Sequence, residues 1–303
     1  MKNKVYTKLG QLPYGMARDK ITEGCIVLEG GAFRGLYTAG VLDALMQAGI
    51  NFRTTIGVSA GSMNGINYVA GQIGRSGRVN LKYRHDSRYV GVKALVTNKG
   101  VIGFDFLFDA IDNEEPLNKE RFFNDDRRFV AVATNCLNGQ ADYLEKGKCS
   151  DIFQAVRASS SLPYVSKMVE IDGIPYLDGG CSDKIPYQWA IDQGYEKIVV
   201  VRTREASFRK HTDMEKLELA AQKFYHGYPE FAHALGTSDC RYNEQCDEID
   251  RLEKEKRIFV IAPSFPVEIK RLERNMEKLG ELYWKGYEDG GSQIIALWDY
   301  LYS

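Results

Sequence analysis

The chain has 303 residues, of which 44% are hydrophobic and 27% charged, and these proportions exclude a disordered or fibrous protein. The 40 Lys and Arg residues nearly balance the 41 Asp and Glu residues, so no overall field would draw the chain to nucleic acid or to an anionic membrane. Large α/β enzymes reach this length as one unit, and we expect a single domain over residues 1–303.

The N-terminal segment and the cysteines indicate the cellular compartment. Residues 1–20 contain no apolar segment typical of a secretory signal, and no apolar run reaches the length of a transmembrane helix. Six cysteines are scattered without CxxC pairs or finger-like spacing: Cys25, Cys136, Cys149, Cys181, Cys240 and Cys246. We therefore expect reduced thiols, no metal site and a cytoplasmic location.

The first two predicted units each join a strand to a helix through a tight turn. Residues 25–29 form an apolar run that ends in glycines, and apolar residues at helical spacing follow up to Gly49. Residues 52–56 repeat the strand, with a sharp turn at 57–61 and a small-residue helix at 63–73. Two adjacent units of this kind predict an α/β fold with a mostly parallel central sheet and helices on both faces.

The rest of the chain continues this pattern and then becomes helical. Further elements are expected as strands at 129–134, 174–177, 197–201 and 257–261, a hairpin partner at 141–145, and helices at 151–160 and 187–193. Residues 205–256 are charged and helix-prone, and the tail at 267–301 predicts two or three amphipathic helices. Composition does not distinguish a lid, a membrane contact and a subunit interface for residues 205–256.

The turn from Gly57 to Gly61 reads Gly-Val-Ser-Ala-Gly and fits the GxSxG pattern between a predicted strand and a predicted helix. Ser59 is the candidate nucleophile, because the two glycines let strand and helix approach closely around a strained serine. The dipole of the following helix favours an oxyanion near the amide of Ala60. The same pattern also occurs by chance in turns rich in glycine and serine.

The preceding turn, from Gly30 to Gly35, also joins a strand to a helix, so it is expected at the same edge of the sheet. The amides of Gly30, Gly31 and Ala32 are candidates for an oxyanion hole. Arg34 adds a charge suited to an oxyanion or a phosphodiester head group, or it is simply a solvated arginine at a helix start. Ala32 breaks the GxGxxG spacing, which disfavours nucleotide binding.

A serine nucleophile needs a base, which is usually a histidine. The four histidines lie in polar or charged segments, and none directly follows a predicted strand: His85, His211, His226 and His233. Asp178 can act as the base directly, because it follows the strand-like run 174–177 and precedes Gly179 and Gly180, which leave its carboxylate accessible. Most Asp-Gly-Gly triplets are ordinary turns, so this one gains its value from the motifs before it.

The motifs GGAFRG, GVSAG and DGG, in this order, resemble those of the patatin-like phospholipase family, which uses a Ser-Asp dyad without histidine. The stretches at 28–31, 38–43 and 158–163 (LEGG, TAGVLD and ASSSLP) are also similar to bacterial members. The resemblance covers about residues 24–202 and implies a three-layer patatin-like core with a helical elaboration at 203–303. It further implies acyl esters of phospholipids or neutral glycerolipids as substrates, and no cofactor.

We expect Asp178 to take the proton of Ser59, which attacks the ester carbonyl and forms an acyl-enzyme that water releases. The family usually has a third glycine where this chain has Ala32, and alanine costs on the order of 1 kcal/mol there if the position needs a positive φ. Three other functions stay open: an acyltransferase on the same dyad, a non-catalytic lipid-binding or regulatory protein, and a thiol enzyme built on Cys181.

The remaining candidates concern the lipid and the surface. Five phenylalanines can line an acyl pocket or a membrane-facing cap, although such clusters are more often core: Phe104, Phe106, Phe108, Phe122 and Phe123. The basic run from Arg75 to Arg88 can touch head groups, although such runs are usually a solvated face. The expected partners are an acyl-ester or phospholipid substrate and a transient membrane surface, with no nucleic acid; the oligomeric state stays open.

Overall fold

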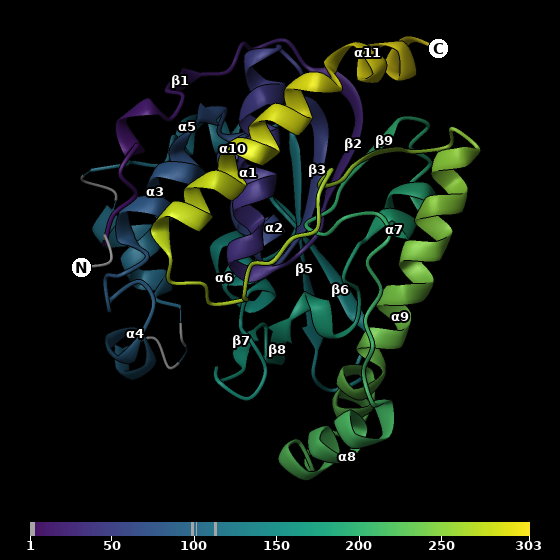
Figure 1. The fold of residues 1–303 in the computed structure, drawn as a ribbon. Coiled ribbons are helices and arrows are strands. Elements are labelled where there is room, and N and C mark those ends of the chain that lie inside the picture. The colour runs from purple at the N-terminus through teal and green to yellow at the C-terminus, as the bar shows by residue number, and fades with distance from the viewer. Residues whose placement is uncertain (1–3, 98–99, 101, 112–113) are drawn as a thin grey trace.

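The computed structural model describes residues 4–97, 100, 102–111 and 114–303 (Figure 1). Within these residues the central sheet has eight strands. In chain order they are β2 (Thr22–Leu28), β3 (Phe52–Val58), β5 (Arg128–Asn135), β6 (Ala141–Glu145), β7 (Val169–Ile171), β8 (Ile174–Asp178), β9 (Ile198–Val201) and β10 (Phe259–Ile261). A separate antiparallel pair consists of β1 (Gly15–Met16) and β4 (Gln72–Ile73).

Neighbouring strands run parallel over most of the sheet, in the order β10-β9-β2-β3-β5. The direction then changes, because β8 and β6 pair antiparallel with β5, and β7 pairs antiparallel with β8. Strands β2, β3, β5 and β9 are buried along nearly their whole length, as parallel strands covered on both faces should be. The predicted mostly parallel sheet and the predicted β5-β6 hairpin are confirmed.

Helices cover both faces of this sheet. They are α1 (Gly35–Gln47), α2 (Ala60–Val69), α3 (Arg75–Tyr83), α4 (Val92–Thr97), α5 (Lys119–Phe123), α6 (Ile152–Ser159), α7 (Tyr187–Asp192), α8 (Met214–Phe224), α9 (Pro229–Lys254), α10 (Met276–Ser292) and α11 (Ile294–Tyr302). None of the helices described is both long enough and apolar enough to cross a membrane.

Alternating side chains on β2 divide the core between the two faces. Ile26 and Leu28 pack with residues of α1, α10 and α11, whereas Cys25 and Val27 pack with residues of α7 and α9. Successive residues of a strand point to opposite faces, so each set requires its own helical layer. The predicted three-layer arrangement follows, with α10 lying across α1 on one side (Figure 1).

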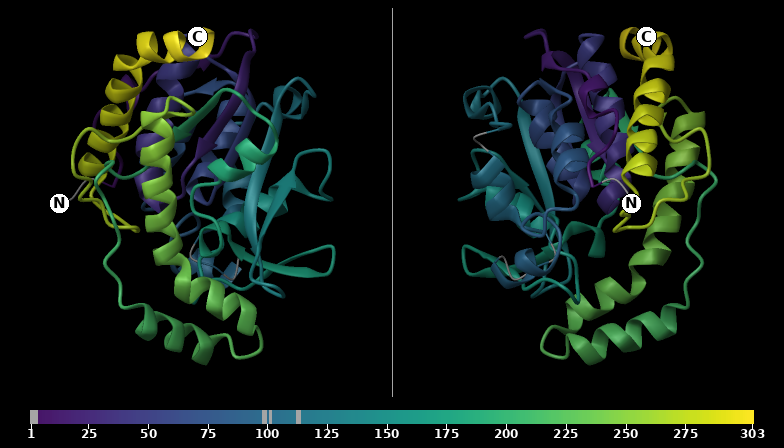
Figure 2. Two further views of the ribbon diagram at one scale, coloured as in Figure 1. Left: turned by 90° about the vertical axis from the view of Figure 1, so that its right-hand side faces the viewer. Right: turned by 60° about the vertical axis from the view of Figure 1, so that its left-hand side comes forward.

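The helices after residue 203 attach to the sheet in two ways. α10 crosses α1 at two glycines: a Cβ on Gly40 would lie 2.0 Å from the carbonyl oxygen of Tyr283, and one on Gly286 would lie 2.0 Å from that of Tyr37. α8 packs on α9 and extends away from the sheet (Figure 2). The expectation of a single domain over the chain stays a prediction.

The helix predicted at 63–73 is wrong at both ends. α2 begins at Ala60, directly after the turn, and ends at Val69. Gly71 then adopts φ 69°, a conformation in which helices commonly stop. The last two residues of the predicted helix form β4 instead, so the strand pairing with β1 overrides their helical spacing.

Candidate active site

Ser59 lies in the tight turn between β3 and α2. Its backbone adopts φ 55° and ψ −122°, a region that residues other than glycine rarely occupy. A Cβ on Gly57 would lie 2.5 Å from the carbonyl carbon of Gly61, and a Cβ on Gly61 would lie 2.3 Å from the carbonyl oxygen of Leu28. The two motif glycines therefore permit contacts between β3, α2 and β2 that no side chain would allow.

Asp178 reaches Ser59 although its strand runs against the parallel part of the sheet. β8 pairs with β5 only at the end of β5, where Asp178 stands opposite Ala133. Val58, the residue before Ser59, stands opposite Val132, the residue before Ala133. Both candidate residues thus lie at one edge of the sheet. The Ser59 hydroxyl donates a hydrogen bond of 2.8 Å to Oδ2 of Asp178.

The surroundings of Asp178 favour a proton acceptor stronger than an ordinary carboxylate. Its side chain is buried, and this burial raises the pKa of the carboxyl. Hydrogen bonds from the Ser59 hydroxyl and the Gly180 amide, together with the charges of Arg271 and Lys184, oppose the rise in pKa. The net direction is upward, toward the range in which a general base works best.

Serines at the end of α6 and directly after it support the pair, which no sequence pattern predicted. Ser159 Oγ accepts a hydrogen bond of 2.9 Å from the Ser59 amide, and the Ser161 carbonyl accepts one of 2.8 Å from the Asp178 amide. Ser160 is 2% exposed, and its hydroxyl has no hydrogen-bond partner within the described residues. The serine run in ASSSLP, between a predicted helix and Pro163, is the signal that could have indicated these contacts.

The candidate oxyanion amides are available for a ligand. Within the part of the chain described, the amides of Gly30, Gly31 and Ala32 have no hydrogen-bond acceptor. The Ala60 amide opens α2 and has no acceptor inside that helix. A Cβ on Gly35 would lie 2.8 Å from that of Ala60, so the two turns are in contact. Ala32 has φ 50°, which is the positive φ that favours the family's glycine.

The other motif residues have distinct environments. Gly179 follows Asp178 where a Cβ would lie 2.1 Å from the carbonyl oxygen of Val132. The Arg34 Nε is buried without a partner among the described residues. Burial and the nearby cations Arg204 and Arg271 lower the pKa of Arg34 to about 10. Arg34 is therefore not the solvated arginine of the alternative interpretation.

Two alternatives for the chemistry lose support. None of the four histidines, all within the described residues, hydrogen-bonds to Ser59 or Asp178; His85 contacts the carbonyl of Arg274, for example. Burial raises the pKa of the Cys181 thiol, which disfavours a thiolate nucleophile. No group of three or more His, Cys, Asp or Glu residues in the described chain could hold a metal ion.

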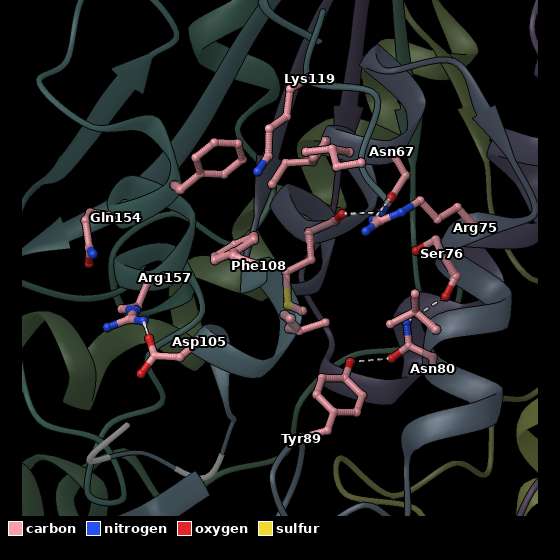
Figure 3. Close-up of a pocket in the computed structure, with 16 residues that line it drawn as sticks. Asn67, Arg75, Ser76, Asn80, Tyr89, Asp105, Phe108, Lys119, Gln154 and Arg157 are labelled. Atoms are coloured by element: carbon pink, nitrogen blue, oxygen red, sulfur yellow. Dashed lines mark hydrogen bonds and ion pairs between the residues drawn. The ribbon is translucent and has the colours of Figure 1, made fainter. Parts of the chain in front are cut away.

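A narrow apolar passage leads from Ser59 into the protein. The first cavity, of about 40 Å³, is lined by Ser59 and Ser160 and ends at Met63, Asn80 and Tyr89. These last three residues also line a second cavity of about 250 Å³ (Figure 3). In it, the Tyr89 hydroxyl donates a 2.8 Å hydrogen bond to Asn80.

The five candidate phenylalanines, and likewise the arginines between Arg75 and Arg88, lie in different environments. Among the described residues Phe108 lines the 250 Å³ cavity, whereas Phe104, Phe106 and Phe122 are buried in the core and Phe123 is 48% exposed. In the run from Arg75 to Arg88, Arg75 and Arg84 are buried. Arg75 also lines the cavity and donates to Asn67 at 2.6 Å. That run is therefore not simply a solvated face.

A wider chamber opens on the other side of Ser59. It measures about 720 Å³ and is lined by Ser59, Asp178, both glycine turns and many charged side chains from the C-terminal third. Ser59, Ala32 and Leu162 line both the chamber and the narrow passage. The candidate nucleophile thus stands where the narrow passage meets a chamber lined by many charged side chains.

The protein has an α/β fold, and its strand-helix turn carries a strained serine that is hydrogen-bonded to a buried aspartate. This is the geometry of a serine acyl-hydrolase. The chain belongs to the patatin-like phospholipase family, whose model matches residues 26–191. A second model, a domain of unknown function called DUF6363, matches residues 228–302.

Individual relatives agree with this assignment. The uncharacterized protein YjjU of Escherichia coli K12 is 34% identical over 183 residues, covering 59% of this chain and 51% of that protein. The uncharacterized NTE family protein Rv1063c of Mycobacterium tuberculosis is 26% identical over 169 residues, covering 53% and 43%. The chain thus matches about half the length of these relatives. VipD from Legionella pneumophila shares the fold, with a TM-score of 0.51, 13% identity and coverage of 99% of this chain and 70% of VipD.

Proposed function

We propose that the protein is a serine hydrolase of lipid acyl esters, with Ser59 as nucleophile and Asp178 as general base. The observation that carries this proposal is the 2.8 Å hydrogen bond from the Ser59 hydroxyl to Asp178, in a backbone turn with φ 55°. Strain of this kind in a residue other than glycine persists mainly at functional sites. Membership of the patatin-like phospholipase family supports a lipid as the substrate.

In the proposed reaction, Asp178 accepts the hydroxyl proton while Ser59 Oγ bonds to the ester carbonyl carbon. The amides of Gly30, Gly31, Ala32 and Ala60 stabilise the oxyanion, helped by the charge of Arg34. The carbonyl re-forms as the bond to the alcohol oxygen breaks, and Asp178 gives its proton to the leaving alcohol. Water then gives a proton to Asp178 and attacks the carbonyl carbon of the acyl-enzyme. The bond to Ser59 breaks, the carboxylic acid leaves, and Asp178 returns the proton to Ser59 Oγ.

We assign the acyl chain to the passage that ends in the 250 Å³ cavity, because that route starts at Ser59 and its first cavity is lined mainly by apolar side chains. We assign a transient membrane contact to exposed apolar residues beside the chamber. Tyr164 and Val165 follow chamber residues in the chain and are 41% and 43% exposed. The Tyr164 ring packs 5.1 Å from that of Phe224, which is itself exposed.

The test is reaction with a fluorophosphonate probe and hydrolysis of p-nitrophenyl acyl esters. Wild-type protein should be labelled and active, and Ser59→Ala should be neither. Ser62→Ala is the matched control, since Ser62 is a buried serine one turn along α2 whose hydroxyl donates to the Ser59 carbonyl at 2.7 Å. A wild-type protein that neither labels nor hydrolyses esters would refute the proposal.

Hydrolysis and acyl transfer share the acyl-enzyme and differ only in the acceptor. Adding acceptor alcohols to the same assay separates them, because a hydrolase releases free acid in their presence. If the new ester is the main product at modest alcohol concentrations, the reaction is acyl transfer.

A further inference from the structure

The chamber beside Ser59 is built largely by the C-terminal third of the chain. Its walls include the segment at 204–212, α9 and the loop at 267–271. α9 and the loop lie inside residues 228–302, the match to the domain of unknown function. The C-terminal third therefore completes the site instead of forming a separate appendage.

The chamber is strongly basic although the chain as a whole is nearly neutral. Among the described residues that line it, seven are Lys or Arg and four are Asp or Glu. Such an excess in a concave site attracts anionic ligands. The question is which of the cations are already neutralised by the protein itself.

Some of these cations have carboxylate partners. Lys184 and Lys210 both form ion pairs with Asp239, and the Lys184 Nζ lies 3.6 Å from Oδ1 of Asp239. Arg209 lies 2.7 Å from an oxygen of Asp247 and 2.6 Å from one of Asp250. These groups are structural pairs and leave little charge for a ligand.

Three arginines differ from this group. Within the described residues, Arg34, Arg204 and Arg271 have no carboxylate at ion-pair distance, and they lie close enough for Arg204 and Arg271 to lower the pKa of Arg34. Glu29 offsets part of this repulsion, but its carboxylate already accepts the amide hydrogen of Thr203. Three guanidinium groups in one chamber, with no carboxylate at ion-pair distance among the described residues, suit a phosphate, which guanidinium binds in a bidentate manner.

We propose that this chamber binds the phosphate of an acyl glycerophosphate, and that Arg204 and Arg271 make the protein select such phosphorylated esters over neutral acylglycerols. The inference rests on the proposed function, because it takes Ser59 as the reaction centre. With the ester at Ser59, the acyl chain extends into the narrow passage, and the glycerol unit carries the phosphate into the chamber. The segment of unknown function thereby acts as the head-group selector.

The two arginines are held in different ways, which gives two independent variants. Arg204 donates to the carbonyl of Val267 and stacks over Phe208, with its guanidinium carbon 4.4 Å from the ring centroid. The Arg271 side chain is exposed, and its only hydrogen bond among the described residues is the one that its backbone carbonyl accepts from the Phe33 amide. Arg271→Met therefore removes the charge without disturbing a packed side chain.

The experiment compares octanoylglycerol phosphate with octanoylglycerol, which have the same acyl chain. The ratio of their kcat/KM values should favour the phosphate ester in the wild type. It should fall about 10- to 100-fold in Arg271→Met and Arg204→Met, the loss expected for a charge-assisted hydrogen bond. Arg209→Met is the matched control, because Arg209 also lines the chamber but is paired with Asp247 and Asp250, and it should keep the wild-type ratio.

A binding measurement separates this inference from the hydrolase proposal. Calorimetric titration of Ser59→Ala protein should give tighter binding of the phosphate ester than of the neutral ester, with the difference lost in Ser59→Ala/Arg271→Met. Ester hydrolysis with equal rates for both substrates would overturn the inference and leave the hydrolase. Absence of hydrolysis would overturn the hydrolase, and the titration would then decide the phosphate site. Inorganic phosphate that binds as tightly as the lipid phosphate would overturn head-group selection.

Discussion

Replacing Asp178 with Asn keeps the shape of the side chain and removes its basicity. The amide oxygen can still accept from the Gly180 amide, and the amide nitrogen can donate to the Ser59 oxygen, so the 2.8 Å contacts at both ends of the carboxylate can be retained. A change in rate then reports the loss of the base and not a collapse of the turn.

The expected loss in kcat/KM is about 10²- to 10⁴-fold, the usual contribution of a positioned general base. At 1.36 kcal/mol for each tenfold change, this corresponds to about 2.7–5.4 kcal/mol of transition-state free energy.

The same substitution should raise the free energy of unfolding at neutral pH. Because burial raises the folded-state pKa of Asp178, its contribution to stability is full at acidic pH and is lost as pH rises through that pKa. The Asn variant should therefore be more stable than wild type at neutral pH, and this gain should shrink toward acidic pH.

The assay is p-nitrophenyl ester hydrolysis with the rate of fluorophosphonate labelling, alongside urea unfolding at neutral and acidic pH. Asp183→Asn is the matched control. The pKa of Asp183 is also raised by burial, but its carboxylate accepts from Tyr143 and Gln245. It should show a gain in stability of the same sign with wild-type activity. Wild-type hydrolysis and labelling rates in Asp178→Asn would refute the role of the carboxylate as base.

Three further predictions concern pH, chain length and packing. The wild-type kcat/KM for a p-nitrophenyl ester should rise with pH through a midpoint above the ordinary Asp value of about 3.9, because ionised Asp178 is the active form and its pKa is raised; a lower midpoint would contradict this. Met63→Phe should narrow the link between the two inner cavities. In a series of p-nitrophenyl esters of increasing chain length, kcat/KM for long acyl esters should fall at least about tenfold relative to that for the acetate. An equal loss of kcat/KM at all chain lengths would exclude the passage as the acyl site. Gly61→Ala should lower the free energy of unfolding by at least about 1–3 kcal/mol, because its Cβ would lie 2.3 Å from a carbonyl oxygen. Gly291→Ala, with open space around it inside α10, should raise that energy by up to about 1 kcal/mol in the same urea titration.

The local parts of the site could be predicted from the sequence because neighbouring residues decide them. Gly57 and Gly61 mark the turn that strains Ser59, and these three positions lie within five residues of one another. The family comparison also indicated Ala32 as a position that favours glycine, and its φ of 50° agrees. The helix boundary at Val69 could not be predicted in this way, because β4 forms only by pairing with β1.

The contacts of Asp178 with Ser59 and with neighbouring segments could be found only from the tertiary structure. The sequence indicated a carboxylate after a strand, but not that β8 runs antiparallel to β5 and overlaps only its end, which brings Asp178 level with Ser59. The bonds from Ser159 and Ser161 likewise join segments that are far from Ser59 in the chain. Strand register and such long-range bonds depend on the packing of the whole sheet, which no local pattern contains.

By itself, the sequence determined the strand-helix alternation, the strained turn at Ser59 and the candidate base, since periodicity and glycine placement are local properties of the chain. The tertiary structure alone decided that the charged C-terminal third forms a wall of the site. Arg34 and Arg271 are separated by more than 200 residues in the chain, yet they lie in one chamber with Arg204. The nearly equal numbers of acidic and basic residues in the whole sequence hide this cluster, because most of the acidic residues lie outside the chamber.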